Sequence, residues 1–117
     1  MVADLSGIST HILDTSLGRP AAAVAVTLEQ KIGDAWVFLS RQTTDGHGRV
    51  KQMLPDAKAL EAAEYRLSFA TGAYFAAFGV AGLYPVVEIT FEVCSGGGHY
   101  HIPLLLTANG YSTYRGS

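Results

Sequence analysis

The sequence predicts an all-β fold, a sandwich of two sheets with one short helix. Short runs in which β-branched and aromatic residues alternate with polar ones recur along the chain, and residues that favour turns separate them. The chain does not show strands that alternate with long helices, the pattern that would indicate βαβ units. About eight strands and one helix are expected, a number typical of two packed sheets.

The expected elements follow from these signals in chain order. Turns rich in Gly, Pro, Asp and Asn are expected at residues 14–20, 31–34, 45–48, 95–98 and 109–110. A short helix is expected at 74–78, because Thr71-Gly72 can open it and Gly79 can end it. The strands are expected at residues 6–13, 22–30, 36–43, 49–51, 64–70, 86–93, 100–107 and 110–114.

Length and charge indicate one domain, residues 1–117, that binds neither nucleic acid nor a membrane. The net charge is −2 and the eight basic residues are scattered, so no basic stripe could follow a phosphate backbone. The longest apolar region, residues 73–87, is interrupted by two glycines and Pro85, which argues against a transmembrane helix. An apolar fraction of 49% with only 15% charged residues is high for a small monomer and indicates a further buried surface, such as a contact between subunits.

Cysteine usage and the chain ends bear on the compartment. The single cysteine, Cys94, excludes an intrachain disulfide and fits a reducing compartment, and we expect it to be a small buried side chain. Residues 1–4 lack the basic start and apolar stretch of a secretory signal, and no Ser-Lys-Leu ends the chain. We therefore expect a cytoplasmic protein, with a peroxisomal address of another kind left open.

Alternation along three of the expected strands gathers polar residues on common faces. If these strands lie in one sheet, histidines, a tyrosine and the end of the chain share one surface. Residues that favour strands continue almost to Ser117, so the terminal segment is expected at the margin of that sheet rather than frayed. The three sets are Ser9, His11 and Leu13; His99, His101, Pro103 and Leu105; and Ser112, Tyr114 and Gly116.

Position alone leaves ordinary structural interpretations open for these residues. His11 and His101 could be surface histidines, His47 an exposed turn residue, and Arg49 a charge that discourages edge pairing. His99 and His101, with His11 as a third ligand, could hold zinc, although no carboxylate shares these faces to orient the rings. Residue spacing therefore predicts a β-sandwich with an unidentified polar site.

Several separated motifs add a family resemblance. They are Ser9-Thr10-His11-Ile12-Leu13-Asp14, Gly18-Arg19-Pro20-Ala21, Asp45-Gly46-His47-Gly48-Arg49, His99-Tyr100-His101-Ile102-Pro103-Leu104-Leu105 and Tyr111-Ser112-Thr113-Tyr114-Arg115-Gly116-Ser117. In this order, and across essentially the whole chain, they resemble the 5-hydroxyisourate hydrolases, also called transthyretin-like proteins. The terminal Tyr-Arg-Gly-Ser is the most specific of these marks.

The resemblance implies a transthyretin-like β-sandwich of two four-stranded sheets with one short helix, assembled as a homotetramer with sites where dimers meet. It implies hydrolysis of 5-hydroxyisourate, the product of urate oxidation, to 2-oxo-4-hydroxy-4-carboxy-5-ureidoimidazoline. It implies no metal and no organic cofactor. The alternatives are a carrier such as transthyretin, since one fold can serve several functions, and a zinc hydrolase built on His11, His99 and His101.

The family's functional residues fall on His11, Arg49, His101, Tyr114 and Ser117. The resemblance implies catalytic roles for all of these except Tyr114, and substrate contacts for all except His101. A histidine base suits hydrolysis near neutral pH, and the guanidinium suits urate-like oxygens and transition-state charge. Arg49 and a second imidazole are expected to lower the pKa of the base, and which histidine removes the proton is left open.

Overall fold

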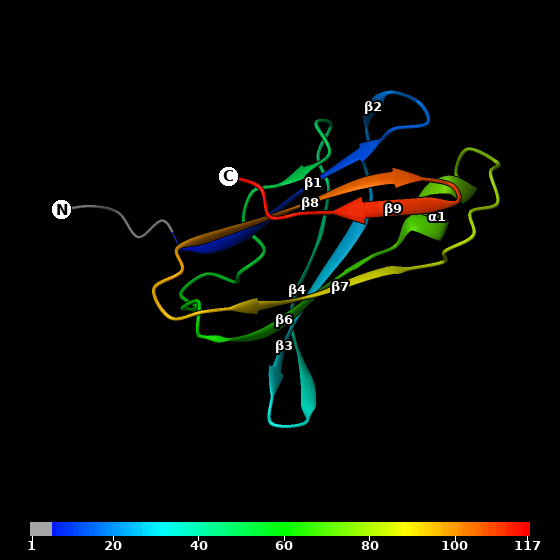
Figure 1. Cartoon of the computed structure of the whole chain (residues 1–117). Coiled ribbons are helices and arrows are strands. Elements are labelled where there is room, and N and C mark those ends of the chain that lie inside the picture. The colour runs from blue at the N-terminus through cyan, green and yellow to red at the C-terminus, as the bar shows by residue number, and fades with distance from the viewer. Residues whose placement is uncertain (1–5) are drawn as a thin grey trace.

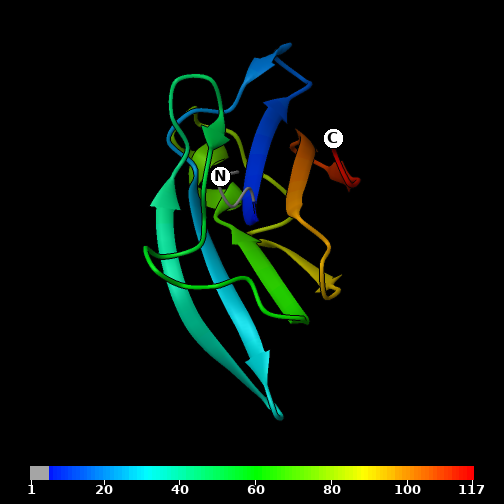
Figure 2. The ribbon, with the colours of Figure 1, turned by 90° about the vertical axis from the view of Figure 1, so that its left-hand side faces the viewer.

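Two sheets packed face to face form the part of the chain that the structure describes, residues 6–117 of a computed structural model (Figures 1 and 2). The expectation drawn from residues 1–4 lies outside these residues. The all-β sandwich with one short helix is confirmed. In chain order the elements are β1 (Gly7–Asp14), β2 (Arg19–Pro20), β3 (Ala25–Ile32), β4 (Ala35–Thr43), β5 (Arg49–Val50), β6 (Ala63–Phe69), α1 (Thr71–Ala76), β7 (Val87–Val93), β8 (His99–Thr107) and β9 (Gly110–Thr113).

The two sheets differ in how their strands are arranged. One has the order β4-β3-β6-β7 with antiparallel neighbours, and its β3–β4 hairpin extends beyond the other strands (Figure 2). The other has the order β2-β1-β8-β9, with β5 also paired to β1. This sheet has five strands rather than the implied four, because β5 and β2 follow one another along the same edge of β1. At any point along β1 the sheet is therefore no more than four strands wide.

The facing sides of the two sheets supply the core. In β8, Tyr100, Ile102, Leu104 and Leu106 are buried, as the alternation predicts. The opposite side of the same sheet consequently carries the histidines of β1 and β8, and it faces away from the other sheet. Other fully buried core side chains are Ile8, Ile12, Val26, Leu28, Tyr65, Leu67 and Phe69.

The helix begins earlier than the sequence predicts. Thr71 belongs to α1 itself, and its Oγ1 donates a hydrogen bond to the carbonyl oxygen of Tyr84 (2.9 Å). The turn after α1 ends at Gly79, whose φ of 72° suits glycine. Within residues 6–117 no helix is long and apolar enough to span a membrane.

Cys94 is exposed, so the expectation that it is buried is wrong. It follows directly after the last residue of β7 and begins a turn, in which the N–H of Gly97 donates to its carbonyl oxygen (3.1 Å). A residue at this position leaves the sheet and its side chain does not reach the core.

Candidate functional site

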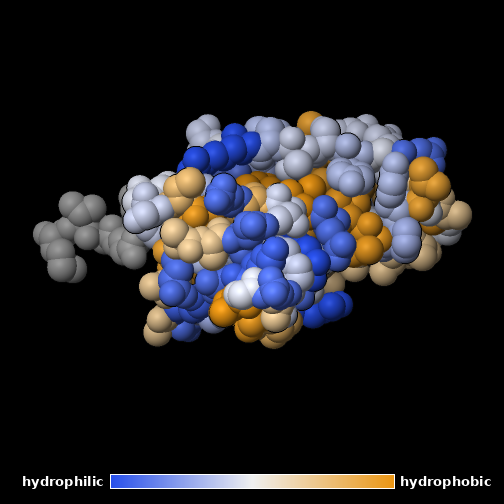
Figure 3. Space-filling model, turned by 60° about the horizontal axis from the view of Figure 1, so that its bottom comes forward, coloured by the Kyte–Doolittle hydropathy of each residue, from blue (hydrophilic) through white to orange (hydrophobic). Residues whose placement is uncertain are grey.

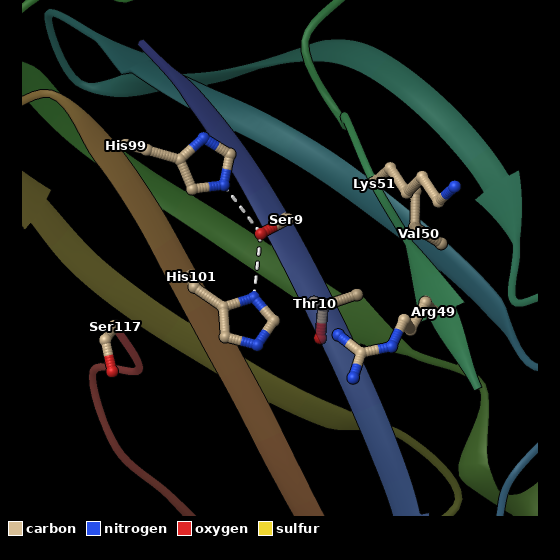
Figure 4. A pocket seen from close by; sticks show the side chains of 8 residues that line it. All are labelled: Ser9, Thr10, Arg49, Val50, Lys51, His99, His101 and Ser117. Atoms are coloured by element: carbon tan, nitrogen blue, oxygen red, sulfur yellow. Dashed lines mark hydrogen bonds between the residues drawn. The ribbon is translucent and has the colours of Figure 1, made fainter. Parts of the chain in front are cut away.

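A pocket of about 240 Å³ lies against β1, β5, β8 and the terminal segment. In Figure 4 the imidazoles of His99 and His101 lie on one side of it, and the guanidinium of Arg49 lies on the other. The volume is below the roughly 300–1,000 Å³ of sites for drug-sized ligands, so the pocket suits a smaller, polar molecule. The lining residues are Ser9, Thr10, Arg49, Val50, Lys51, His99, His101 and Ser117.

The turn before β5 positions Arg49. A carboxylate oxygen of Asp45 accepts a hydrogen bond from the N–H of Arg49 (3.0 Å). Gly48 has a φ of 74°, and a Cβ there would lie 2.4 Å from the carbonyl oxygen of Ile12, so only glycine lets the turn lie this close to β1. The resulting β1–β5 register places Arg49 opposite His11.

Arg115 ties the terminal segment to the start of β8. Its Nη2 donates to the carbonyl oxygens of Gly97 (3.2 Å) and His99 (3.4 Å). Its guanidinium carbon lies 4.1 Å from the centre of the Tyr100 ring, a cation–π contact. The segment is therefore held along β8 by both hydrogen bonds and stacking.

Gly116 brings the end of the segment against the site. Its N–H donates to the carbonyl oxygen of His101 (2.8 Å), which forms an isolated bridge to β8. A Cβ at Gly116 would lie 2.5 Å from Cδ2 of His101, closer than such atoms can approach, and 3.2 Å from Cγ of Pro103, which is also tight. The absence of a side chain at this position therefore allows Ser117 to line the pocket beside His101.

Gly116→Ala is expected to lower kcat by about 10-fold or more, because misplacing a catalytic group by about 1 Å can cost 100-fold. The added methyl group must displace either the His101 ring or the terminal segment. The free energy of unfolding should fall by only about 1 kcal/mol, the usual size of a point substitution. Gly110→Ala is the control, because a Cβ there meets only Thr107 Oγ1 at 3.7 Å. Equal kcat values for the two variants would contradict the prediction.

Ser9 links the two histidines of β8. The parallel β1–β8 register places Ser9 opposite His101 and Gly7 opposite His99. The Oγ of Ser9 lies 2.7 Å from Nε2 of His99 and 2.7 Å from Nδ1 of His101, as the dashed lines in Figure 4 show. Ser9 is only 8% exposed, so both rings are oriented by a buried hydroxyl.

The environment of the site lowers the pKa of two histidines. Burial, followed by the positive charge of Arg49, lowers the pKa of His11 below its ordinary value of 6.5, while a hydrogen bond to the backbone of His47 and then the charge of Asp45 act in the opposite direction. Burial, then Arg49, and then His11 and His99 lower the pKa of His101. The direction agrees with the expectation from the sequence, although burial rather than charge is the largest cause. Both imidazoles are therefore more readily neutral, and able to accept a proton, than an ordinary histidine.

The acidic limb of the pH dependence of kcat/KM is expected below about pH 6.5, the ordinary histidine pKa. The lowered pKa values mean that the basic form persists as the pH falls below that value, and activity is lost only when the histidine is protonated. A pH–rate profile measures this limb for the free enzyme. A limb centred above the ordinary value would contradict the prediction.

The structure places the five residues predicted from the sequence in three positions. Arg49, His101 and Ser117 line the pocket. His11 lies beside it, opposite Arg49, and its charge acts on His101. Tyr114 is 56% exposed and lines a separate groove with residues of β7, β8 and β9. The roles assigned to these residues stay predictions.

Sequence reasoning places Ser9 and His99 only on the polar faces, offers His99 only as a zinc ligand and does not single out Lys51, although all three line the pocket. Alternation places Ser9 and His99 on the same faces as His11 and His101, and this is the signal that could identify them. Lys51 lies just past β5, and a strand of two residues has no period from which to assign a face.

The zinc alternative finds no support in the geometry. Within residues 6–117 no three His, Cys, Asp or Glu side chains are grouped so that they could hold a metal ion. His99 and His101 instead converge on the hydroxyl of Ser9.

A family model described as "HIUase/Transthyretin family" matches residues 8–116, nearly the whole chain. The chain belongs to this family. A 5-hydroxyisourate hydrolase of Salmonella typhimurium is 44% identical over 110 residues, which cover 94% of this chain and 80% of that protein.

Solved structures of both kinds of family member are similar to this HIUase/Transthyretin chain. The 5-hydroxyisourate hydrolase of Klebsiella pneumoniae has a TM-score of 0.84 and 39% identity, covering 96% of this chain and all of that one. The transthyretin of Sparus aurata has a TM-score of 0.87 and 31% identity, covering 94% of this chain and 96% of that one. Because the fold is shared, the residues of the site must decide between the two kinds of function.

Proposed function

We propose that this chain hydrolyses 5-hydroxyisourate, the product of urate oxidation, to 2-oxo-4-hydroxy-4-carboxy-5-ureidoimidazoline. One observation carries the proposal: a half-buried imidazole and a guanidinium line the same small pocket from opposite sides. Hydrolysis of a cyclic amide needs both a base near neutrality and a group that stabilises a developing negative charge. The relatives named 5-hydroxyisourate hydrolase support the same function.

In the proposed reaction, Nε2 of His101 removes a proton from water as the water oxygen bonds to a ring carbonyl carbon. The guanidinium of Arg49 stabilises the oxyanion that forms. When the oxyanion collapses, the carbon–nitrogen bond breaks and the leaving nitrogen takes the proton from His101, so the six-membered ring opens. His11 helps to position the water, and Ser117 forms a hydrogen bond with the ring.

We place this activity in a homotetramer with sites where dimers meet. Among residues 6–117, β7 and β9 each pair with a strand on one side only, so each offers a free edge to another subunit. Figure 3 shows a hollow lined by apolar side chains between two polar margins. Exposed large apolar side chains further support a subunit contact. They include Leu17, Phe78, Val80, Leu83, Tyr84, Val86 and Tyr111.

The tetramer also gives Tyr114 a place in the proposal. Tyr114 lies outside the pocket of its own chain, so we assign its contact with substrate to the assembled protein. Light scattering should give about four times the chain mass of 12.4 kDa. A monomer at micromolar concentration would contradict this part of the proposal.

The proposed compartment is the cytoplasm, which the free and exposed Cys94 supports.

The decisive experiment follows the decay of 5-hydroxyisourate, generated in the cuvette from urate by urate oxidase. The protein is expected to accelerate the decay in proportion to its concentration. A folded tetramer that leaves the spontaneous rate unchanged would refute the hydrolase. A carrier function, the second candidate because of the similarity to a transthyretin, would then be favoured. Binding of ligands to the protein would be measured next.

A further inference from the structure

Three of the residues that line the pocket form a hydrogen-bonded chain that ends at an exposed side chain. His101 is half-buried, Ser9 is buried, and His99 is exposed. The Ser9 hydroxyl lies 2.7 Å from a ring nitrogen of each histidine. Such a chain is short enough at each step for a proton to move along it.

Counting protons restricts the chain to two arrangements when both rings are neutral. The Ser9 hydroxyl has one proton, so it can donate to only one of the two rings, and the other ring must donate to it. In the first arrangement Nδ1–H of His101 donates to Ser9 and Ser9 donates to Nε2 of His99, so Nε2 of His101 is bare. In the second, Nε2–H of His99 donates to Ser9 and Ser9 donates to Nδ1 of His101, so Nε2 of His101 carries a proton.

Arg49 favours the first arrangement. In Figure 4, Nε2 of His101 lies on the side of the ring towards the guanidinium. A guanidinium has only donors and a fixed positive charge, so a bare ring nitrogen is more stable beside it than an N–H group. The same positive charge helps to lower the pKa of His101.

We propose that Ser9 and His99 form a proton relay, which sets His101 to the tautomer with a bare Nε2 and connects this ring to solvent. When Nε2 takes a proton from water, Nδ1–H passes its proton to Ser9, and Ser9 passes its own proton to Nε2 of His99. His101 is then neutral with Nε2–H, and the positive charge is on the exposed His99. The reverse movement returns the proton when Nε2–H protonates the leaving nitrogen. This step rests on the proposed hydrolase function; the tautomer does not.

Kinetics of three variants separate a relay from simple support of the His101 ring. His99→Ala and Ser9→Ala should each lower kcat by about 10- to 100-fold, a part of the factor that acid–base catalysis contributes, with KM little changed. Ser9→Thr keeps the hydroxyl and should restore most of the rate. Imidazole added to the buffer should raise kcat of His99→Ala, because a free base can accept the proton from Ser9. It should not raise kcat of Ser9→Ala, which lacks the link to His101.

His47→Ala is the matched control, because His47 is an exposed turn residue that does not line the pocket. Its kcat should equal that of the wild type, with or without imidazole. Wild-type kcat in His99→Ala, or a loss that imidazole does not reverse, would overturn the relay. If the wild type itself fails to accelerate substrate decay, the proposed function fails instead.

Nitrogen-15 spectra of the histidine rings test the tautomer without any turnover. At neutral pH, wild-type His101 is expected to carry its proton on Nδ1, and Ser9→Ala should shift the proton towards Nε2, whereas Ser9→Thr should not. Wild-type His101 with its proton on Nε2, or a His101 spectrum that Ser9→Ala leaves unchanged, would overturn the assignment of Ser9. This result stands whether or not the protein proves to be a hydrolase.

Discussion

His101→Ala is expected to lower kcat for 5-hydroxyisourate by about 100- to 10,000-fold, the range that a positioned acid–base group contributes. The expectation rests on the place of His101 in the pocket, on its lowered pKa, and on its hydrogen bond to Ser9. Removing the ring removes all three of these features. Stopped-flow measurement of substrate decay gives kcat and KM for the variant.

The control for His101→Ala is again His47→Ala, which removes an imidazole outside the pocket. The free energy of unfolding of His101→Ala should change by only about 1 kcal/mol, the value of one hydrogen bond. A folded His101→Ala variant with wild-type kcat would remove His101 from the mechanism. His11→Ala would then be the next variant, because His11 lies opposite Arg49 and also has a lowered pKa.

The sequence is sufficient to predict the fold because its signals are local. Alternation separates Tyr100 and Ile102, which are buried, from His99 and His101 on the other face, and the structure agrees. The helix start is predicted three residues too late, since the hydrogen bond from Thr71 to Tyr84 joins segments separated in sequence. Local propensity carries no information on such a contact.

Only a part of the site can be predicted, because some of its contacts join segments far apart in the sequence. The resemblance identifies Arg49, His101 and Ser117, and these line the pocket. The bridge at Ser9 depends on β1 and β8 being parallel neighbours in one register, although more than 80 residues separate them. A shift of that register by one residue would turn Ser9 away from both histidines. Strand period gives the face of a residue but not its neighbour in the next strand.

Arg49→Lys is expected to lower kcat by about 100-fold, within the range for loss of one group that stabilises an oxyanion. Lysine keeps the positive charge but replaces a planar fork of donors with a single point charge on a flexible stem. Arg41→Lys, on the exposed strand β4 and outside the pocket, makes the same chemical change and should leave kcat unchanged. Wild-type kcat in Arg49→Lys would show that the geometry of the guanidinium is not used.

Arg49→Gln separates the charge of this residue from its shape. The positive charge of Arg49 is among the causes that lower the pKa of both His11 and His101. Removing the charge should therefore raise these pKa values and move the acidic limb of kcat/KM to higher pH, whereas Arg49→Lys should leave the limb in place. A limb that stays in place in both variants would mean that burial alone keeps the base neutral. Arg49 would then act only on the substrate, and the loss of kcat in the two variants would measure that contact.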